Sequence, residues 1–489
     1  MKLQSLSHVH ETLALRSNHS ATKNIPAGIR SCALKEDLRG QSVAVVGMGI
    51  SGRAAARLAL ARGASVLAID QNENLGPLEQ DPLFEKHSGL RPILGHFDRE
   101  LLKDADMVVV SPGVPPENYD LSSLLQSGRR VMSELDFAAE VIPESIKILA
   151  VTGTNGKSTV ATFCGQMLNH LGIEAFVGGN LGNPLSEAAF RCLTLPSSEA
   201  MFQVAVVEVS SYQMEIPNKY FYPSVAVVLN LTPDHLERHK TMRNYAATKC
   251  RLFSHMTSSK LGILPLGNQH LNEAIREHVH EFNLAWIGAL PGVKIDMEAK
   301  VASLKIPGTG PVAQLQLGAM KVLGAHNYDN AAVAALSVLG LDLGIDVEAI
   351  GSTIVKLRSL PHRMQIVHED MHGITWLDDS KATNVEATYT GLMGLKEQKS
   401  VILLGGLAKV VLSTQESCGF EQLVEPLKYH RCVITFGSSG MLIQKTLLDN
   451  GLSIPCIRAT NLEDAINCAR SVARCDSQSS NLSVSPCTP

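Results

Sequence analysis

The sequence predicts an α/β protein built on parallel sheets, and three observations support that prediction. Short apolar runs rich in β-branched residues recur along the chain, each with the length of a buried parallel strand. Segments with helical patterning separate these runs, as in βαβ units. Glycine turns or polar residues directly follow many of the runs. Because 489 residues are too many for one core, we expect three domains.

Composition excludes several classes of protein. The net charge of −4 is not that of a protein that binds nucleic acid or a membrane surface, so we expect neither partner. No apolar run reaches transmembrane length. The ten cysteines contain no C-x-x-C pair, which indicates reduced thiols rather than disulfides or a zinc site. We expect the protein to be a monomer.

The first 37 residues differ in character from the rest of the chain. Up to Lys35 the only acidic residue is Glu11, whereas serine and basic residues are frequent. This composition is typical of an organellar transit peptide, and the alternative is a disordered extension of a cytoplasmic protein. We expect residues 1–37 to lie outside the fold and to direct the protein to the chloroplast stroma.

Residues 38–143 predict a Rossmann-like domain. The strand Ser42–Val46 leads into the glycine turn Gly47–Gly52, which reads G-M-G-I-S-G, and an alanine-rich helix follows. A second strand, Ser65–Asp70, ends in an acidic residue, and a third strand is Met107–Val110. The order strand, glycine loop, helix, strand, acid is that of a dinucleotide-binding unit.

The ligand of this first domain is left open by its residues. A G-x-G-x-x-G loop is a weak signal, and it accepts any diphosphate, including that of a UDP-sugar as well as NAD. A nicotinamide-dependent oxidoreductase is therefore one hypothesis. It leaves the phosphate loop and the polar strand ends of the following domain without a role.

The strongest motif is the phosphate loop. The apolar strand Ile146–Val151 precedes the turn Gly153–Gly156, and Lys157 and Ser158 open a helix that ends near Gly172. Loop N–H groups and a helix N-terminus together bind phosphate; the lysine adds a charge for the β- and γ-phosphates, and the serine hydroxyl can bind Mg²⁺. The spacing is the short G-T-N-G-K-S variant. It predicts a nucleoside triphosphate site.

Two successive apolar strands of this central domain, residues 144–360, are followed by polar residues. The strand Val204–Val207 is followed by Glu208, and His235 lies just beyond the strand Val225–Leu229. Ligands of parallel sheets bind beyond the carboxyl ends of the strands, so both residues should lie near the phosphate loop. They are candidate ligands of Mg²⁺.

Two other residues of the central domain can be explained without any role in ligand binding. Taken alone, Lys249 is a surface lysine on a helix. Asn327 precedes an alanine-rich helix and could cap it.

Residues 361–474 predict a third α/β domain with its own sheet. Its strands are Ile374–Leu377, Val401–Leu404 and Cys432–Phe436. The first of them ends in the polar turn Asp378–Asn384.

Together the motifs resemble one family. G-T-N-G-K-S-T, E-V-S-S-Y-Q, N-L-T-P-D-H-L-E-R, Y-A-A-T-K, H-N-Y-D-N, L-P-H-R and D-D-S-K-A-T-N occur in the order of the Mur ligases, and the resemblance spans Leu38 to Ala473. Those enzymes couple an amino acid to a UDP-muramoyl precursor of peptidoglycan. The G-M-G-I-S-G and D-D-S-K-A-T-N motifs look like those of the branch that adds D-glutamate.

The resemblance implies a fold, a reaction and a set of residues. The fold is a Rossmann-like domain, a phosphate-loop ATPase-type domain and a second Rossmann-like domain. The reaction joins D-glutamate to UDP-N-acetylmuramoyl-L-alanine with ATP and Mg²⁺, through an acyl phosphate. The implied catalytic residues are Lys157, Glu208, His235 and Lys249, the last as a carbamate; the implied metal ligands are Ser158, Glu208, His235 and Lys249. The residues implied for ATP are Gly153, Thr154, Asn155, Gly156, Lys157, Ser158, Thr159, Asn327, Asn330, Arg363 and Asp379. The residues implied for the other substrates are Ile50, Ser51, Asp70, Ser111, Gly113, Asn180, Ser210, Gln213, Lys381, Thr383 and Lys409.

The sequence departs from the family pattern at two points. Gly406 to Lys409 lacks the usual acidic residue before the lysine, and after Ala473 the family's strand, serine-rich loop and closing helix do not follow. We therefore expect an incomplete third domain and a disordered tail at 475–489. The alternative function is a nucleotide-binding protein of this type whose ligation is impaired or lost.

Overall fold

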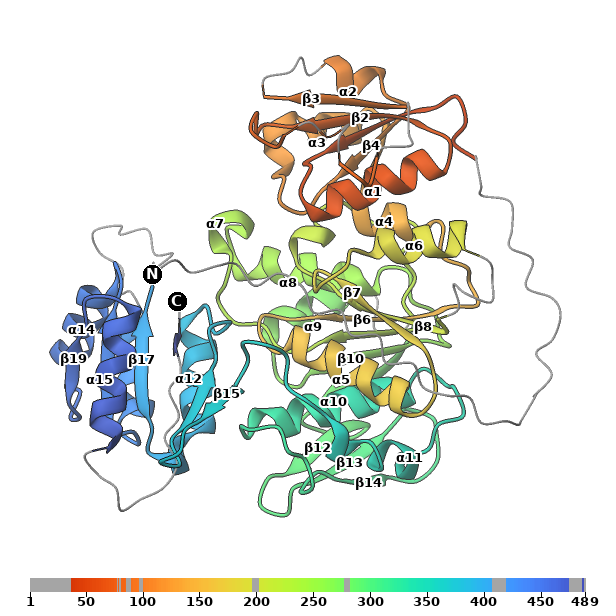
Figure 1. The fold of residues 1–489 in the computed structure, drawn as a ribbon. Coiled ribbons are helices and arrows are strands. Elements are labelled where there is room, and N and C mark those ends of the chain that lie inside the picture. Colours follow the sequence, from red (N-terminus) through yellow and green to blue (C-terminus); the bar gives the residue numbers. More distant parts are fainter. Residues whose placement is uncertain are drawn as a thin grey trace, which may run out of the picture. The chain divides into compact units, whose positions relative to one another are not determined.

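The computed structural model describes residues 37–76, 78, 81–84, 89–95, 100–195, 202–276, 282–406 and 419–474, and the backbone of residues 486 and 487. Three groups of alternating strands and helices follow one another along the chain (Figure 1). The strands form sheets of five, nine, two and four strands in this part of the chain. The α/β class with parallel sheets is confirmed.

The first sheet is entirely parallel, in the order β3-β2-β1-β4-β5. This is the strand order of a Rossmann unit. The helical segments between its strands supply the layers that cover it (Figure 1). The strands are β1 (Ser42–Val46), β2 (Ser65–Asp70), β3 (Leu90–Leu94), β4 (Met107–Val110) and β5 (Arg130–Ser133). The helical segments are α1 (Ile50–Ala61), α2 (Glu100–Asp104), η2 (Pro116–Tyr119) and α3 (Leu121–Gln126).

The second sheet has nine strands, in the order β14-β13-β12-β11-β10-β9-β6-β8-β7. The strands from β7 to β12 in this order are parallel, and β12, β13 and β14 form an antiparallel meander at one edge. The parallel strands are β6 (Lys147–Thr152), β7 (Ala175–Gly179), β8 (Val204–Glu208), β9 (Val225–Val228), β10 (Leu261–Pro265) and β11 (Asn283–Ile287). The meander is β12 (Gly292–Asp296), β13 (Val301–Lys305) and β14 (Ala313–Gln316).

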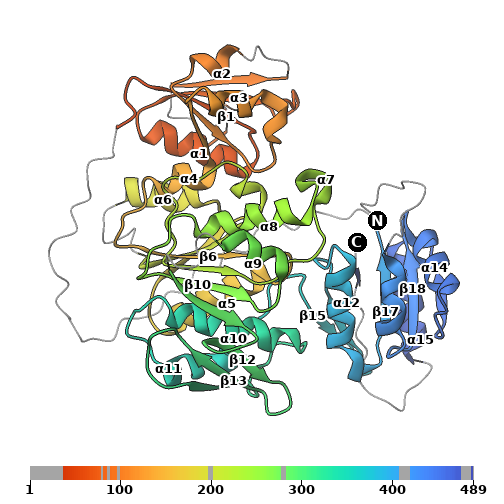
Figure 2. The same cartoon turned by 180° about the vertical axis from the view of Figure 1, so that it is seen from behind.

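Helices cover both faces of this nine-stranded sheet (Figure 2). On one face α5 packs against α10, and residues such as Phe163, Met167 and Leu336 form a fully buried core with the strands. Burial of this kind contributes roughly 1.5–3 kcal/mol for each large apolar side chain. The segments are α4 (Glu134–Ala139), α5 (Lys157–His170), α6 (Leu185–Thr194), η3 (Tyr212–Met214), α7 (Leu236–His239), α8 (Met242–Cys250), η4 (Arg251–Phe253), α9 (Gln269–Ile275), α10 (His326–Leu339), α11 (Val347–Gly351) and η5 (Ile354–Lys356).

The first two sheets are joined by packing as well as by the chain. Helix α6 packs on α1 and α4, and one apolar cluster includes residues of both sheets. Arg57 of α1 forms an ion pair with Glu187 of α6 at 3.0 Å and lies over the Phe190 ring. The positions of β1, β2, β4 and β6 agree with the strands predicted from the sequence.

The last part of the chain contains a two-stranded and a four-stranded sheet. The four-stranded sheet is parallel, in the order β19-β18-β17-β20, and apolar clusters fill both of its faces. The strands are β15 (Gln365–Glu369), β16 (Thr375–Asp378), β17 (Val401–Gly405), β18 (Cys432–Phe436), β19 (Cys456–Arg458) and β20 (Pro486–Cys487). The helical segments are α12 (Val385–Gly394), η6 (Lys396–Gln398), η7 (Phe420–Leu423), α13 (Val424–Leu427), α14 (Gly440–Asp449) and α15 (Leu462–Arg474).

Two expectations for this region are wrong. Strand β16 belongs to an antiparallel pair with β15 and not to the parallel sheet, because residues 370–373 reverse the chain between the two strands. The tail was expected to lack regular structure, yet Pro486–Cys487 pairs in parallel with Leu403 and Leu404 of β17. The edge of a parallel sheet offers unpaired N–H and C=O groups, and a proline is tolerated in an edge strand. The remainder of the tail lies outside the described residues, and the expected domain boundaries stay predictions.

Two further findings concern composition. No helix in the described ranges is long and apolar enough to cross a membrane. The described cysteines are free thiols, as expected: Cys164, Cys192, Cys250, Cys432, Cys456 and Cys468.

Candidate active site

The central strand β6 carries the phosphate loop, and its neighbours are β8 and β9. The three strands are parallel, so their carboxyl ends lie at one edge of the sheet. Glu208 ends β8, and residues 229–235 follow β9. The sheet order therefore brings both predicted strand ends beside Lys157, as expected from the parallel topology.

The phosphate loop has a backbone that requires glycine. Gly156 has φ +86°, and a Cβ at this position would lie 2.9 Å from Oδ1 of Asn330. Gly153 has φ +146°, and its Cβ would press on the backbone and Cβ of Leu229. Any residue other than glycine would therefore be strained at either position.

Asn230 fastens the loop to the neighbouring strand end. Its Oδ1 accepts the N–H groups of Thr154 at 3.0 Å and Asn155 at 2.8 Å, and its Nδ2 donates to the Asn155 carbonyl at 3.0 Å. Thr154 Oγ1 adds a bond to the Thr232 carbonyl. Asn230 was not among the residues predicted for the site, although its place directly after the predicted strand Val225–Leu229, as the first residue of the N-L-T-P-D-H motif, is a usable signal.

Lys157 begins α5, and its ammonium group donates to the Thr154 carbonyl at 2.7 Å. Burial lowers the pKa of Lys157, and the carboxylates of Glu208 and Asp234 oppose that shift. Arg363 adds a further lowering influence. The Lys157 ammonium held among these groups is suited to bind a polyphosphate, whose negative charge would stabilise the cation further.

A cleft of about 870 Å³ opens in front of the loop. Glu208 is almost fully buried at its wall; its Oε1 accepts from Nδ2 of Asn180 at 3.0 Å, while its Oε2 is buried with no hydrogen-bond partner among the described residues. Such an orphaned carboxylate oxygen is costly unless a ligand or ion binds to it. The predicted residues that line this cleft are Thr154, Asn155, Gly156, Lys157, Ser158, Asn180, Glu208, His235, Arg363, Lys381 and Thr383.

A second pocket adjoins the loop on the side of α10. Asp379 is buried there, and burial raises the pKa of its carboxyl to about 6 although its Oδ1 accepts the Met364 N–H at 3.1 Å. Arg363 contributes to both cavities, and its Nε is buried without a hydrogen-bond partner in the part of the chain that the structure describes. The predicted residues that line the second pocket are Asn155, Gly156, Thr159, Asn327, Asn330, Arg363 and Asp379.

The capping interpretation of Asn327 is wrong. Helix α10 begins at His326, and the side chain of Asn327 donates to the Leu323 carbonyl at 2.5 Å instead of accepting from the helix. Its Oδ1 accepts from Nδ2 of Asn330 at 3.1 Å. The two asparagines thus form a polar pair beside Gly156.

A third pocket, of about 440 Å³, lies at the carboxyl end of the first sheet. Both oxygens of Asp70 accept backbone N–H groups, from Met48 at 2.6 Å and from Asn72 at 2.8 Å. Asp70 therefore closes the glycine turn as well as lining the pocket. Asn180 lines this pocket and the main cleft, so it connects them. The predicted residues at the pocket are Ile50, Ser51, Asp70, Ser111, Gly113 and Asn180.

Four of the predicted residues that the structure describes do not line these cavities: Gly153, Ser210, Gln213 and Lys249. Ser210 and Gln213 bond to one another, since Gln213 Oε1 accepts both the N–H of Ser210 at 2.9 Å and its hydroxyl at 3.1 Å. Lys249 is buried beneath the loop, where its Nζ donates to the Gly153 carbonyl at 2.9 Å and lies 4.5 Å from the Tyr245 ring centroid. The surface-lysine interpretation is therefore wrong. Lys409 lies outside the described residues.

Burial and the nearby charge of Lys157 hold the pKa of Lys249 well below its ordinary value. The first cause is desolvation, because α8 carries the side chain into the space under the loop. A buried amine that favours its neutral form is a potential nucleophile.

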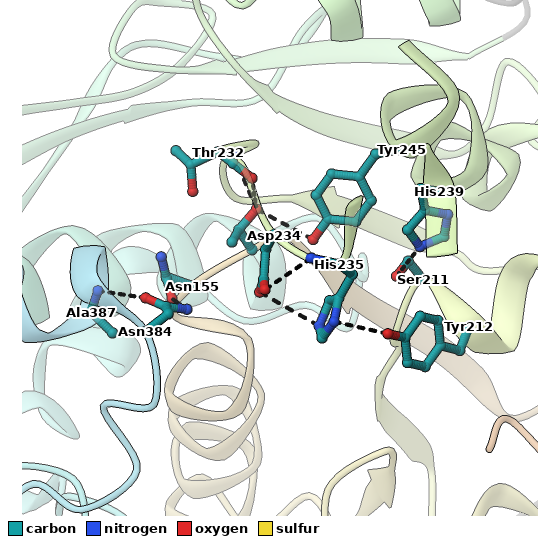
Figure 3. A network of polar contacts seen from close by, with 12 residues as sticks. Asn155, Ser211, Tyr212, Thr232, Asp234, His235, His239, Tyr245, Asn384 and Ala387 are labelled. Carbon is teal, nitrogen blue, oxygen red and sulfur yellow. Dashed lines mark hydrogen bonds and ion pairs between the residues drawn. The ribbon is translucent and has the colours of Figure 1, made fainter. Parts of the chain in front are cut away.

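A polar network extends from the loop to His235 (Figure 3). Nδ1 of His235 lies 2.9 Å from the Tyr212 hydroxyl, and Nε2 lies 3.5 Å from Oδ2 of Asp234. Asn384 caps α12 through the Ala387 N–H and also approaches Asn155 Oδ1 at 3.4 Å. Sequence reasoning missed Tyr212, Asp234 and Asn384 as members of this site, because their contacts depend on the tertiary fold.

A magnesium site fits these residues in part. The described residues include no group of three or more His, Cys, Asp or Glu side chains that could hold a metal ion by themselves. Mg²⁺ is commonly bound by one or two carboxylates together with phosphate oxygens and water. The unpartnered Oε2 of Glu208, which faces the cleft that contains Ser158, suits that kind of site.

A phosphate loop on a central parallel strand, facing a cleft shared with the last α/β region, is typical of an enzyme that binds a nucleoside triphosphate. Family models narrow this class: the Mur ligase middle domain matches residues 151–338, and the Mur ligase MurD-like N-terminal domain matches residues 41–133. The chain belongs to the Mur ligase family.

Individual relatives support the same family assignment. The UDP-N-acetylmuramoylalanine–D-glutamate ligase of Desulfatibacillum aliphaticivorans is 34% identical over 441 residues, which cover 90% of this chain and 92% of that protein. The enzyme of the same name from Lachnospira eligens is 34% identical over 76% of this chain and 78% of its own length. The UDP-N-acetylmuramate-alanine ligase MurC of Thermotoga maritima shares the fold, with a TM-score of 0.54, 17% identity and coverage of 92% of this chain and 96% of that one.

Proposed function

We propose that this protein joins D-glutamate to UDP-N-acetylmuramoyl-L-alanine in an ATP-dependent reaction of peptidoglycan precursor synthesis. The names and coverage of the relatives support the substrates. The observation that carries the proposal is the meeting of Lys157, Glu208 and His235 in one cleft, from β6, β8 and β9. Two further pockets flank this cleft, one lined by Asn327 and Asn330 and the other by Asp70, and each is proposed to contribute to binding a nucleotide.

The first step would transfer the γ-phosphoryl group of ATP to the carboxylate of the alanyl substrate. The substrate oxygen forms a bond to phosphorus, and the bond between the γ-phosphorus and the bridging oxygen breaks, which yields an acyl phosphate and ADP. The chain's contribution is to position the groups and to neutralise charge. Loop N–H groups at the start of α5 and the Lys157 ammonium would perform that task.

The second step would form the amide. The free amine of D-glutamate attacks the acyl carbon, a tetrahedral intermediate forms, and phosphate leaves with its electron pair. Lys381 and Thr383 line the cleft opposite the phosphate loop, which suits them to bind the incoming amino acid. Arg363 touches both the cleft and the ATP pocket and is suited to link the two substrates.

Mg²⁺ would be held by Glu208, His235 and Ser158, and its chemistry would be to offset the charge of the phosphate oxygens. Lys249 is proposed to carry a carbamate, formed when its neutral amine attacks CO₂ and releases one proton. Its burial under the loop and its low pKa support that reaction. The resulting anion would supply an oxygen ligand of the kind that Mg²⁺ prefers.

We also propose that the protein acts in plastids. The support is the low acid content and the abundance of serine and basic residues up to Lys35, which lie outside the described residues. Residues 1–37 fused to a fluorescent reporter should bring it to plastids. A diffuse cytosolic signal would refute the localisation and leave the enzymatic proposal unaffected.

The enzymatic proposal is tested by product formation. The full chain is incubated with ATP, Mg²⁺, UDP-N-acetylmuramoyl-L-alanine and each of a panel of amino acids, and the amide product is detected by mass spectrometry. Product with D-glutamate, and little with L-glutamate or glycine, is the expected result. Binding of ATP without any amide product would instead favour the alternative of a nucleotide-binding protein that does not ligate.

A further inference from the structure

The Tyr212 hydroxyl lies between two partners. It is 2.9 Å from Nδ1 of His235 and 3.2 Å from Oε1 of Glu237, to which it donates. Figure 3 shows the Tyr212 side chain pointing at the imidazole from one side, while Asp234 lies on the other. Tyr212 belongs to the short helical segment η3 that follows β8, so it reaches His235, which follows β9, across the end of β6 that lies between these two strands.

The number of hydrogens on the Tyr212, Glu237 and His235 side chains limits how they can bond to one another. A phenol has one hydrogen, and a carboxylate can only accept. If the Tyr212 hydrogen is given to Glu237, the phenol oxygen can only accept from His235, so the proton of the imidazole must be on Nδ1. The other nitrogen, Nε2, then carries a lone pair.

Asp234 favours the opposite arrangement. Its Oδ2 lies 3.5 Å from Nε2 of His235, and a proton on Nε2 would be attracted to it. That distance exceeds the range of a good hydrogen bond, whereas the 2.9 Å contact with Tyr212 lies within it. Oδ1 of Asp234 already accepts the backbone N–H of His235 at 3.0 Å. The 2.9 Å contact is compatible with either direction of donation, so the Glu237 carboxylate decides the tautomer: its Oε1 accepts the Tyr212 hydrogen and lies 3.6 Å from Nδ1 of His235.

The ring of Tyr212 is held firmly enough for this role. The guanidinium of Arg238 lies 4.2 Å from the ring centroid, and Arg238 is itself fixed by an ion pair with Glu215. His239 stacks on the ring at 5.8 Å and is anchored by a 2.9 Å contact between its Nε2 and the Ser211 hydroxyl. A clamped ring cannot turn its hydroxyl away from His235 without losing these contacts.

We propose that Tyr212 is a positioning residue that selects the Nδ1–H tautomer of His235 and so presents the Nε2 lone pair as a metal ligand. Partners that fix the tautomer of a ligating histidine typically change metal affinity 10- to 100-fold. The inference rests on the metal site proposed above. The tautomer itself is a property of the metal-free chain, so it can be measured independently of that site.

The tautomer is read from ring ¹⁵N shifts in long-range ¹H–¹⁵N correlation spectra of the full chain labelled at histidine. His235→Gln identifies the signal. We expect the Nδ1–H form in the wild type and a shift toward the Nε2–H form in Tyr212→Phe, which lacks the hydroxyl. The matched control is Tyr222→Phe, since Tyr222 meets His255 edge-on and lies outside the cleft. It should leave the His235 signals unchanged.

A second variant tests the proton count without touching the clamped ring. Glu237 is exposed, so Glu237→Ala should fold normally. With its acceptor removed, the Tyr212 hydroxyl is released to donate to Nδ1, and His235 should move to the Nε2–H form. A wild-type Nε2–H signal, or a tautomer that neither variant changes, would overturn the inference.

The affinity of the protein for a metal ion is the second measurement that tests the inference. Binding of Mn²⁺ in the presence of ADP, followed by electron paramagnetic resonance, should weaken about 10-fold or more in Tyr212→Phe. Unchanged Mn²⁺ affinity in a variant whose tautomer has changed would also overturn the inference. Failure of the proposed function would show up differently, as a wild-type chain that binds substrates and makes no amide.

Discussion

Asn230 and Asn155 are joined by two hydrogen bonds that form a closed pair. Oδ1 of Asn230 accepts the Asn155 N–H at 2.8 Å, and Nδ2 donates to the Asn155 carbonyl at 3.0 Å. Asn230 follows β9, and β9 pairs with β6, the strand that precedes the phosphate loop. The loop is therefore shaped by the neighbouring strand end before any nucleotide arrives, which lowers the ordering cost of binding.

The first prediction concerns this pair. Asn230→Ala leaves the N–H groups of Thr154 and Asn155 without their acceptor, and loss of such a partner costs about 1–3 kcal/mol. ADP affinity measured by titration calorimetry should fall by about 10-fold or more. Asn283→Ala is the control, because the exposed side chain of Asn283, at the start of β11, donates to the Ser258 carbonyl, away from the phosphate loop. Equal affinities of the two variants would contradict the role given to Asn230.

Lys157→Ala should lower ATP turnover by about 10²-fold or more, the order expected when one preorganised electrostatic group is removed. The fold should persist, since the side chain of Lys157 donates to the Thr154 carbonyl within its own loop. Phosphate release is the measurement, with Lys294→Ala on the exposed face of β12 as control. Turnover near that of the control would refute the phosphate-loop assignment.

Lys249→Ala should be inactive in ordinary buffer and regain part of its activity when a small carboxylic acid is added. A free carboxylate can occupy the space of the proposed carbamate beside the Gly153 carbonyl. Activity as a function of added acetate or propionate tests this. Wild-type activity of the variant without any additive would mean that Lys249 has only a structural contact.

The buried carboxyl of Glu134 should make the free energy of unfolding depend on pH. Burial raises the pKa of its carboxyl to about 7, above the ordinary value of 4.5, so the folded chain binds a proton that the unfolded chain releases. Stability should therefore fall as the pH rises from about 4.5 to 7 and stay lower above that range, by an amount on the order of 3 kcal/mol. Glu134→Gln keeps an oxygen for the Ser186 N–H and should flatten this dependence in thermal unfolding. An unchanged pH profile would show that Glu134 does not titrate in this range.

The parallel strands and the phosphate loop could be predicted because their signals are local. The run Ser42–Val46 is the strand β1 itself, and β-branched runs followed by glycine or polar residues mark β6, β8 and β9. The rule that ligands bind at the carboxyl ends of parallel strands was then enough to bring Glu208 and His235 to Lys157.

The rest depends on contacts between distant residues. A lysine on a helix gives no sign in the sequence that it will be buried, so Lys249 could only be singled out through the family resemblance. The pairing of β20 with β17 joins segments about 80 residues apart and depends on an open sheet edge. Tyr212 reaches His235 across two strand ends, a contact that requires the strand order.

The central claim is that the substrate carboxylate becomes an acyl phosphate, and oxygen transfer tests it most directly. UDP-N-acetylmuramoyl-L-alanine labelled with ¹⁸O in the alanyl carboxylate is converted with ATP and D-glutamate, and the released phosphate is examined by ³¹P NMR. The account predicts one ¹⁸O atom in each phosphate formed, because the attacking oxygen leaves with the phosphoryl group. Phosphate free of ¹⁸O, formed along with amide product, would contradict it.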